Sequence, residues 1–246
     1  MPLSFRDVMF RLPAAYVARS GWPALGAVVA GVIIFIGATL AGAAAMGLMA
    51  SVVDIPVGSL ATMGEGDQTQ VRVFILTLVV QQAAMIWLTV FFADRFGGRA
   101  AEVLALDHRP SQRSLYLGSF ALMAMLLIGL DFVGLAIGPK DVVNDLKPFA
   151  KLITSDSWWL TLLAVGVGAP LSEELLFRGF LFSALAQTRL GALGATVLTT
   201  AAWTALHGNY SAFGMFEVAV IGCFLSWLLW RTGSLWVPIF CHAVYN

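Results

Sequence analysis

The sequence predicts an all-α, polytopic transmembrane bundle of about 7–8 helices. Of the 246 residues, 59% are hydrophobic and only 11% are charged, and the mean hydropathy is +0.86. Soluble domains have about a quarter of their residues charged, so this composition is typical of an integral membrane protein. Apolar runs recur along the chain at lengths near the roughly 20 residues that cross a bilayer. The formal net charge is zero, so nothing indicates a nucleic-acid partner.

Seven apolar runs are expected to form the transmembrane helices, and the last two are short. Their boundaries are 23–52, 71–93, 114–138, 157–177, 191–208, 213–230 and 234–246. Residues 5–19 precede them and have the pattern of an amphipathic segment lying on the membrane surface. The first run is too long for the apolar region of a signal peptide. The last run stops at Asn246, within the expected helix, which would allow a tail to follow.

The distribution of arginine predicts the orientation, because cytoplasmic loops carry an excess of Lys and Arg. Arginines precede the first run, fill the loop after the second and recur on the same side if the helices alternate: Arg6, Arg11, Arg19, Arg95, Arg99, Arg109, Arg113, Arg178, Arg189 and Arg231. The loop at 53–70 contains no Lys or Arg. We therefore expect a cytoplasmic (inner) membrane protein with a cytoplasmic N-terminus, in which a cysteine at Ser59 is labelled from outside. The loop 139–156, with three lysines, departs from this pattern.

The stretch LSEELLFRGF, residues 171–180, places three charges beside an apolar run. Glu174 and Arg178 are four residues apart with Glu first, the favourable order for an ion pair on a helix. Glu173 points to a different face and has no local partner. An unpaired carboxylate in a membrane costs several kcal/mol, so Glu173 is a candidate functional residue. The alternative is that this stretch is a helix end at the membrane surface, with all three charges solvated.

Two of the three histidines lie in or beside apolar runs. His207 follows Trp203 by four residues, which places an aromatic ring beside the imidazole. His242 and Asn246 are also four apart and share a helix face. The third histidine, His108, lies in the arginine-rich loop and is expected to be solvated. A lone buried histidine usually only hydrogen-bonds within the core, but two of them with a free carboxylate and an amide favour a site.

The spacing of these residues predicts that two of them meet. If the chain reverses near Leu190, Glu173 lies 17 residues before that turn and His207 lies 17 residues after it. In an antiparallel hairpin of equal rise, the two side chains then lie at one depth. If the chain continued as a straight helix beyond His207, His207 and His242 would lie at different depths in the membrane. We therefore expect 207–214 to be non-helical, which is tolerated inside a membrane only beside a cavity.

These motifs resemble those of a known family. The sequences EELLFRG at 173–179, the aromatic residue four before His207, and His242 four before Asn246 are similar to three motifs of the CPBP family. This family comprises type II CAAX prenyl proteases and abortive-infection (ABI) proteins. RTGSLWVPIFCHAVYN, 231–246, is similar to its usual ending, and Trp203 stands where the family often has Phe. The resemblance covers roughly 158–246 and implies a catalytic core at 157–246, joined in one membrane domain to a transmembrane region at 1–156.

The resemblance implies an intramembrane endopeptidase with an active-site cavity inside the bundle. Its functional residues would be Glu173, His207, His242 and Asn246, supported by Glu174, Arg178 and Trp203. Glu173 would be the general base, and His207 would orient or deprotonate the attacking water. His242 and Asn246 would donate hydrogen bonds to the oxyanion.

A metal is the open question of this mechanism. Glu173, His207 and His242 are residue types that can ligate zinc with an open fourth position. They come from three separate helices, however, and the chain has no HExxH motif. We favour a glutamate-type mechanism without a cofactor and keep zinc as the alternative, in which Glu174 would have to be the base.

Two other functions have to be weighed. In a proton-coupled transporter, Glu173 and the histidines would form a relay, but transporters often have repeated halves, and this chain shows no such repeat. A catalytically inactive immunity factor or scaffold of the same fold is less consistent with an intact set of motifs. The polar residues of the N-terminal runs, Gln81, Gln82 and Asp131, are expected to form interhelical hydrogen bonds.

The expected partners are the lipid bilayer and a protein or peptide substrate. The resemblance implies cleavage near a substrate's C-terminus, as in a prenylated CAAX protein. Bacteriocin-type peptides and other membrane proteins remain alternatives. The sequence does not choose among these substrates.

Overall fold

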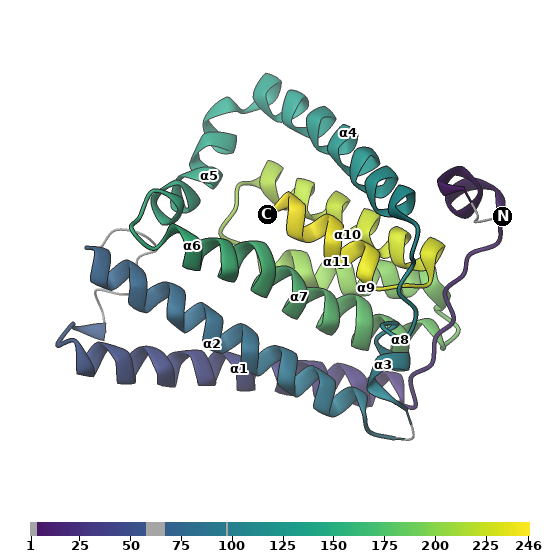
Figure 1. Cartoon of the computed structure of the whole chain (residues 1–246), viewed down its shortest axis with the longest axis horizontal. Helices are drawn as coiled ribbons and strands as arrows, with labels where there is room; N and C mark the ends of the chain where they lie inside the picture. The colour runs from purple at the N-terminus through teal and green to yellow at the C-terminus, as the bar shows by residue number, and fades with distance from the viewer. Residues whose placement is uncertain (1–3, 58–66, 97) are drawn as a thin grey trace.

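The computed structural model describes residues 4–57, 67–96 and 98–246, and every regular element in these ranges is a helix (Figure 1). The elements in chain order are η1 (Asp7–Arg11), α1 (Ala24–Val52), α2 (Gln68–Ala93), α3 (Ala100–Val103), α4 (Arg113–Ile137), α5 (Pro139–Ile153), α6 (Trp158–Thr161), η3 (Leu162–Gly168), α7 (Ala169–Glu173), η4 (Glu174–Leu181), α8 (Phe182–Ala186), α9 (Gly191–Ala205), α10 (Ala212–Thr232) and α11 (Trp236–Tyr245), where η marks π-helix. The predicted labelling site Ser59 lies outside the described residues.

Five helical stretches are long and apolar enough to cross a membrane, which confirms the prediction of a polytopic helical bundle. They are Ala24–Val52, Gln68–Ala93, Arg113–Ile137, Trp158–Ala186 and Ala212–Thr232. The runs 191–208 and 234–246 are helical as expected, but α9 has 15 residues and α11 has 10. Both are therefore too short to span the bilayer alone.

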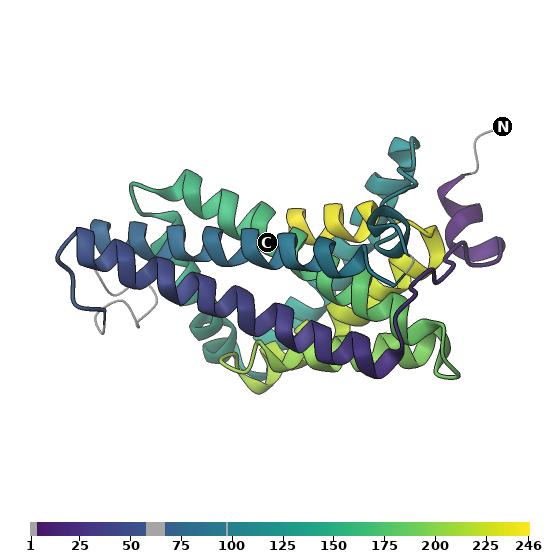
Figure 2. The same cartoon turned by 90° about the horizontal axis from the view of Figure 1, so that it is seen from below.

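Helices α1 and α2 form an antiparallel pair at one side of the bundle, visible in both views (Figures 1 and 2). Small residues allow the close approach: a Cβ at Gly42 of α1 would lie 3.0 Å from Cβ of Gln81 in α2. Asp67 begins α2 by accepting hydrogen bonds from the backbone N–H groups of Thr69 and Gln70. This capping satisfies donors that have no partner within the helix.

Helix α5 corrects the expectation of a loop at 139–156. It is a strongly amphipathic helix that connects α4 to α6 (Figure 1). Asp145 fixes it to the rest of the bundle by accepting hydrogen bonds from the backbone N–H and the hydroxyl of Ser211, at 2.9 and 2.7 Å. The lysines that departed from the orientation pattern therefore belong to an amphipathic helix at the end of α4, where charged residues can remain at the membrane surface.

The stretch Trp158–Ala186 is one helix with two π-helical segments, at Leu162–Gly168 and Glu174–Leu181. A π-helical turn contains more residues than an α-helical turn and often marks a functional site. The second segment carries Arg178, whose side chain is 0% exposed. Arg178 was expected on the cytoplasmic side with the other arginines, and its side stays a prediction, because burial does not show on which side of the membrane a residue lies. Arg178 lies inside the bundle because Glu174 accompanies it there.

The N-terminal segment crosses one end of the bundle. Only residues 5–11 are helical, so the amphipathic stretch expected over 5–19 is shorter than predicted. The buried Arg231 of α10 holds this segment by donating from Nη2 to the carbonyls of Val8 and Leu12, at 2.6 and 2.7 Å. The backbone N–H of Tyr16 donates to the carbonyl of Trp230 at 3.2 Å. The N-terminal segment is therefore anchored on the last turn of α10.

Candidate active site

A cavity of about 580 Å³ lies among the helices, and all four predicted catalytic residues line it. Most of its wall is apolar. Glu173 enters it from the helix Trp158–Ala186, called the long helix below, and His207 enters from the turn after α9. His242 lies on α11, and Asn246 directly follows it. Residues 206–211 are non-helical, in agreement with most of the predicted irregular stretch 207–214. The structure thus brings together side chains from three segments around one space.

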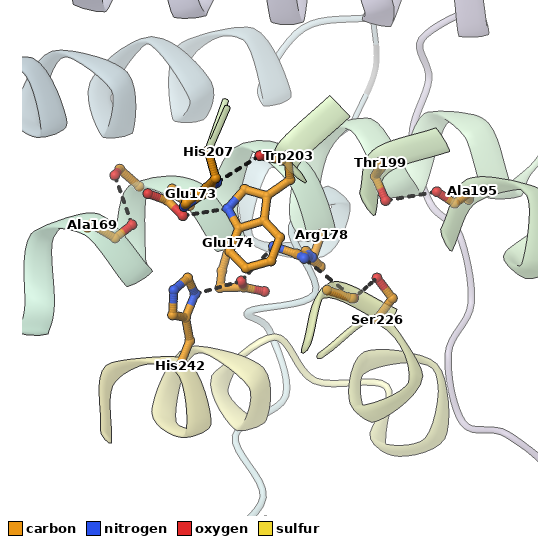
Figure 3. Close-up of polar contacts among 12 residues, drawn as sticks. Ala169, Glu173, Glu174, Arg178, Ala195, Thr199, Trp203, His207, Ser226 and His242 are labelled. Atoms are coloured by element: carbon orange, nitrogen blue, oxygen red, sulfur yellow. Dashed lines mark hydrogen bonds and ion pairs between the residues drawn. The ribbon is translucent and has the colours of Figure 1, made fainter. Parts of the chain in front are cut away.

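Glu173 lies against Trp203. The indole Nε1 donates a hydrogen bond to Oε2 of Glu173 at 2.5 Å (Figure 3). The ring of His207 contacts the indole edge-on, with 5.0 Å between ring centroids. Glu173 therefore faces the residue one helical turn before His207, close to the register that the sequence spacing predicted. Glu173 and His207 are both half-buried, so both are accessible from the cavity.

His207 is oriented by its own helix. Its Nδ1 lies 2.9 Å from the carbonyl oxygen of Trp203. An Nδ1–H that donates to this carbonyl places the lone pair of the neutral ring on Nε2. Among the described residues, Nε2 has no hydrogen-bond partner. It is therefore available to a water molecule or a substrate in the cavity.

Glu174 forms the buried centre of the site. Its Oε1 accepts a hydrogen bond from Nη1 of Arg178 at 2.9 Å and lies 2.9 Å from Nδ1 of His242 (Figure 3). The side chains of Glu174 and Arg178 are 0% exposed, and that of His242 is 3% exposed. Arg178 also stacks on Trp203, with 4.3 Å from Cζ to the ring centroid. The predicted Glu174–Arg178 pair is present.

The contact of His242 with Glu174 was missed from the sequence, which placed His242 beside Asn246 as a free donor. The two residues are 68 positions apart, and no spacing rule connects them. A carboxylate bound to Nδ1 fixes the orientation and tautomer of an imidazole. Because Nδ1 is engaged, Nε2 is the ring nitrogen of His242 that remains for a partner in the cavity.

Asn246 is held by a hydrogen bond to the long helix. Its Nδ2 donates a hydrogen bond to the carbonyl oxygen of Val165 at 3.0 Å. Val165 belongs to the first π-helical segment. An amide nitrogen carries two hydrogens, so one of them remains for another acceptor. Asn246 lines the same cavity as His242, one helical turn farther on.

The arrangement does not gather the predicted zinc ligands. Within the described ranges, no group of three or more His, Cys, Asp and Glu side chains is placed to hold a metal ion. Oε2 of Glu173 is bound to the indole of Trp203. Structural and catalytic zinc sites need ligand atoms about 2.0–2.2 Å from one ion. We therefore derive no step through a metal.

Gln81 and Gln82 also line the cavity, which the sequence did not predict. They were expected to hydrogen-bond to neighbouring helices, but neither side-chain amide has a hydrogen bond to another residue of the described ranges. Asp131, which was given the same role, is exposed on α4. The signal for Gln81 and Gln82 was their position near the middle of an apolar helix, where a polar side chain needs a partner.

Comparisons with known proteins agree with the motifs. The family described as type II CAAX prenyl endopeptidase Rce1-like matches residues 155–246. The chain is 30% identical over 126 residues to the "Uncharacterized 24.3 kDa protein" of Escherichia coli, a match that covers 49% of this chain and 56% of that protein. No solved structure matches the chain. Over residues 155–246, the multi-pass membrane protein therefore matches the family of type II CAAX prenyl endopeptidases, as the three motifs predicted.

Proposed function

We propose that the protein is an intramembrane endopeptidase in which Glu173 and His207 activate a water molecule. One observation carries this proposal: an accessible carboxylate and an accessible imidazole share a cavity in an apolar bundle, directly beside a fully buried charged pair. Glu173 has one carboxylate oxygen bound to Trp203 and the other free of protein hydrogen bonds within the described ranges. Glu174 is fully buried and engaged by Arg178 and His242, so Glu173 is the carboxylate that a water molecule in the cavity can reach.

The first step is the attack of water on the substrate's carbonyl carbon. Glu173 accepts a proton from the water, and Nε2 of His207 accepts a hydrogen bond from its second O–H. The C–O bond forms and the carbonyl oxygen becomes an oxyanion. Glu173 then returns the proton to the leaving nitrogen as the C–N bond breaks, so that protons and charge balance over the cycle.

His242 and Asn246 would stabilise the oxyanion. In its protonated form, His242 donates from Nδ1 to Glu174 and from Nε2 to the oxyanion. Asn246 contributes the N–H that Val165 leaves free. A donor of this kind is typically responsible for about 10²–10³ in rate. Glu174 and Arg178 are positioning residues, because they act on the reaction through His242.

The family match and the cavity support one substrate class, a prenylated or apolar peptide. The family name implies cleavage near the C-terminus of a prenylated protein. The mostly apolar cavity is consistent with an apolar peptide segment or a prenyl chain. Residues 1–156 would support the catalytic core at 157–246 and complete the cavity from α1, α2 and α5.

The proposal is tested by comparing the proteins of membranes that contain the wild-type chain with those that contain Glu173→Ala. A new C-terminus that depends on Glu173 supports the proposal and identifies the substrate. The purified protein is tested in parallel on a quenched-fluorescent peptide with a farnesylated cysteine four residues from its C-terminus. The proposal would be wrong if neither test detected cleavage and if vesicles containing the protein took up a solute together with protons in a way that depends on Glu173. The transporter would then be the better function.

Activity is expected to survive exhaustive chelation, because the residues that the structure describes offer no set of three ligands to one ion. Cleavage is measured before and after incubation with a strong chelator, with the metal content of the purified protein determined in the same samples. Rates should agree within about twofold. Loss of activity on chelation and its recovery with stoichiometric zinc would contradict the metal-independent mechanism.

The N-terminus is expected to lie in the cytoplasm of a cell whose inner membrane holds the protein, since arginines cluster on that side. The test uses two cysteines in a background in which Cys223 and Cys241 are replaced by alanine. Val57→Cys, at an exposed position five residues beyond the end of α1, should react with a membrane-impermeant thiol reagent in intact cells. Arg189→Cys, in the exposed turn before α9, should react only after permeabilisation. The reverse result would invert the topology.

A further inference from the structure

Two glutamines, Gln81 and Gln82, lie near the middle of the transmembrane helix α2. We call them the amide pair. Both side chains are half-buried and line the cavity, and neither makes a hydrogen bond within the described part of the chain. A polar side chain in the middle of a membrane is costly without a partner and marks a functional position by default. The amide pair therefore needs a partner that the folded chain itself does not supply.

The amide pair is aimed at the cavity by the helix periodicity. Leu78, Gln81, Gln82 and Met85 of α2 line it, at the spacing of one helix face. The polar groups thus interrupt a face that is apolar at both ends. A position that faced lipid would favour an apolar residue. The two glutamines therefore agree with a face that lines the cavity.

Gln82 reaches the same helix that carries the general base. A Cβ on Gly168 would overlap Oε1 of Gln82, so the amide lies directly on the backbone of Gly168. Gly168 precedes Glu173 by five residues on the long helix, which is about 7.5 Å at 1.5 Å per residue. An extended peptide covers about 3.3 Å per residue. Measured along the axis of this helix, the amide of Gln82 is therefore about two extended residues away from Glu173.

This position suits the recognition of a peptide main chain. A substrate cleaved at Glu173 has to be extended locally, and its N–H and C=O groups leave bulk water when they enter the mostly apolar cavity. The side-chain amide of glutamine offers both donors and an acceptor, so it can pair with a peptide group in either direction. Such pairing is independent of the substrate's side chains, as main-chain recognition is when a peptide adds to a sheet edge.

We propose that the amide pair, with Gln82 as its principal member, is a binding subsite for the main chain of the substrate, about two residues from the scissile bond. The proposal rests on the protease function and adds to it residues from the N-terminal half of the chain. It assigns to α2 the task of aligning the peptide, while the long helix and α11 carry out the chemistry. Gln82 is a positioning residue, so its loss should weaken binding more than turnover.

The first experiment separates binding from chemistry with the farnesylated fluorescent peptide. Gln82→Met keeps the length of the side chain but removes its hydrogen bonds. We expect KM to rise about tenfold, with kcat within about threefold of the wild type. The matched control is Thr89→Val on the same helix, whose buried hydroxyl donates to the carbonyl of Met85 and does not line the cavity. It should leave both constants unchanged, whereas equal kinetics for Gln82→Met and wild type would overturn the proposal.

The second experiment asks whether Gln82 pairs with a particular peptide group. Peptides in which single amide bonds near the scissile bond are replaced by esters lose one N–H donor each. The wild type should bind one of these esters about tenfold more weakly, and Gln82→Met should bind that ester and the parent peptide equally. Independent, additive losses would mean that Gln82 acts only on the fold and would overturn the proposal.

A measurement of peptide binding without cleavage tests the amide pair separately from the protease function. The affinity of the peptide is measured by fluorescence anisotropy on Glu173→Gln, with and without Gln82→Met. Weaker binding in the double variant supports the amide pair even if the wild type does not cleave the peptide, a result that would count against the protease function only. Equal peptide affinities of the two variants, or no saturable binding to either of them, would overturn the proposed role of the amide pair.

Discussion

Glu173→Gln is expected to reduce cleavage by at least about 10³-fold while the protein remains folded. A general base contributes about 10²–10⁴ in rate, and glutamine cannot accept a proton. The folded state should persist because the glutamine carbonyl can still accept the hydrogen bond from Nε1 of Trp203. Cleavage of the farnesylated peptide gives the rate, and thermal unfolding in detergent followed by fluorescence gives the stability.

The control for this variant is another half-buried carboxylate. Glu217 on α10 accepts a hydrogen bond from the hydroxyl of Tyr245 at 3.4 Å but does not line the cavity. Glu217→Gln should retain cleavage within a few-fold of the wild type. If Glu173→Gln retained a tenth of the wild-type activity, Glu173 would not be the base. Equal and total loss in well-folded Glu173→Gln and Glu174→Gln would instead favour Glu174 as the base.

Replacing one member of the Glu174–Arg178 pair is expected to destabilise the protein by about 3–5 kcal/mol. Both side chains are fully buried, so Arg178→Leu leaves a carboxylate in an apolar interior with only His242 beside it. Glu174→Met leaves the guanidinium with Trp203 and the carbonyl of Gly222 as its remaining contacts. The free energy of unfolding is measured by denaturation in mixed detergent micelles.

The double variant Glu174→Met/Arg178→Leu distinguishes the structural role from the catalytic one. Replacing both members of a buried pair by apolar residues is often nearly neutral, so most of the lost stability should return. Activity should not return, because Nδ1 of His242 would still lack the carboxylate that orients the ring. Recovery of both would show that the pair serves only the fold, and that His242 needs no positioning by Glu174.

Local patterns in the sequence predicted the parts of the fold that depend on neighbouring residues. Hydrophobic run length indicated the membrane helices, and the i, i+4 spacing predicted the pair of Glu174 and Arg178. The equal distances of Glu173 and His207 from the turn at Leu190 predicted their shared cavity. Each of these inferences needs only helical geometry, which is the same in every protein.

The features that escaped prediction depend on distant contacts or on irregular helix. The contact between His242 and Glu174 joins residues 68 positions apart. The π-helical segments, the second of which contains both Glu174 and Arg178, were not predicted, because an apolar pattern does not show where the number of residues per turn increases. Helix α5 was overlooked because its mixed charges and Pro148 resemble a loop unless the opposite apolar face is recognised. Its fixation by Asp145 on Ser211 again spans two distant segments.

The anchoring of the N-terminal segment by Arg231 has a consequence for biogenesis. The carbonyls of Val8 and Leu12 are synthesised 223 and 219 residues before the guanidinium that binds them. At about 5–20 residues per second, these carbonyls wait for roughly 10–45 s during translation. The N-terminal segment therefore stays undocked while the first four spanning stretches enter the bilayer, and it docks only when the end of α10 has emerged from the ribosome. In ribosome-bound chains arrested before Arg231, residues 5–12 should be more sensitive to protease than in chains arrested after it. This difference would show when the N-terminal segment docks.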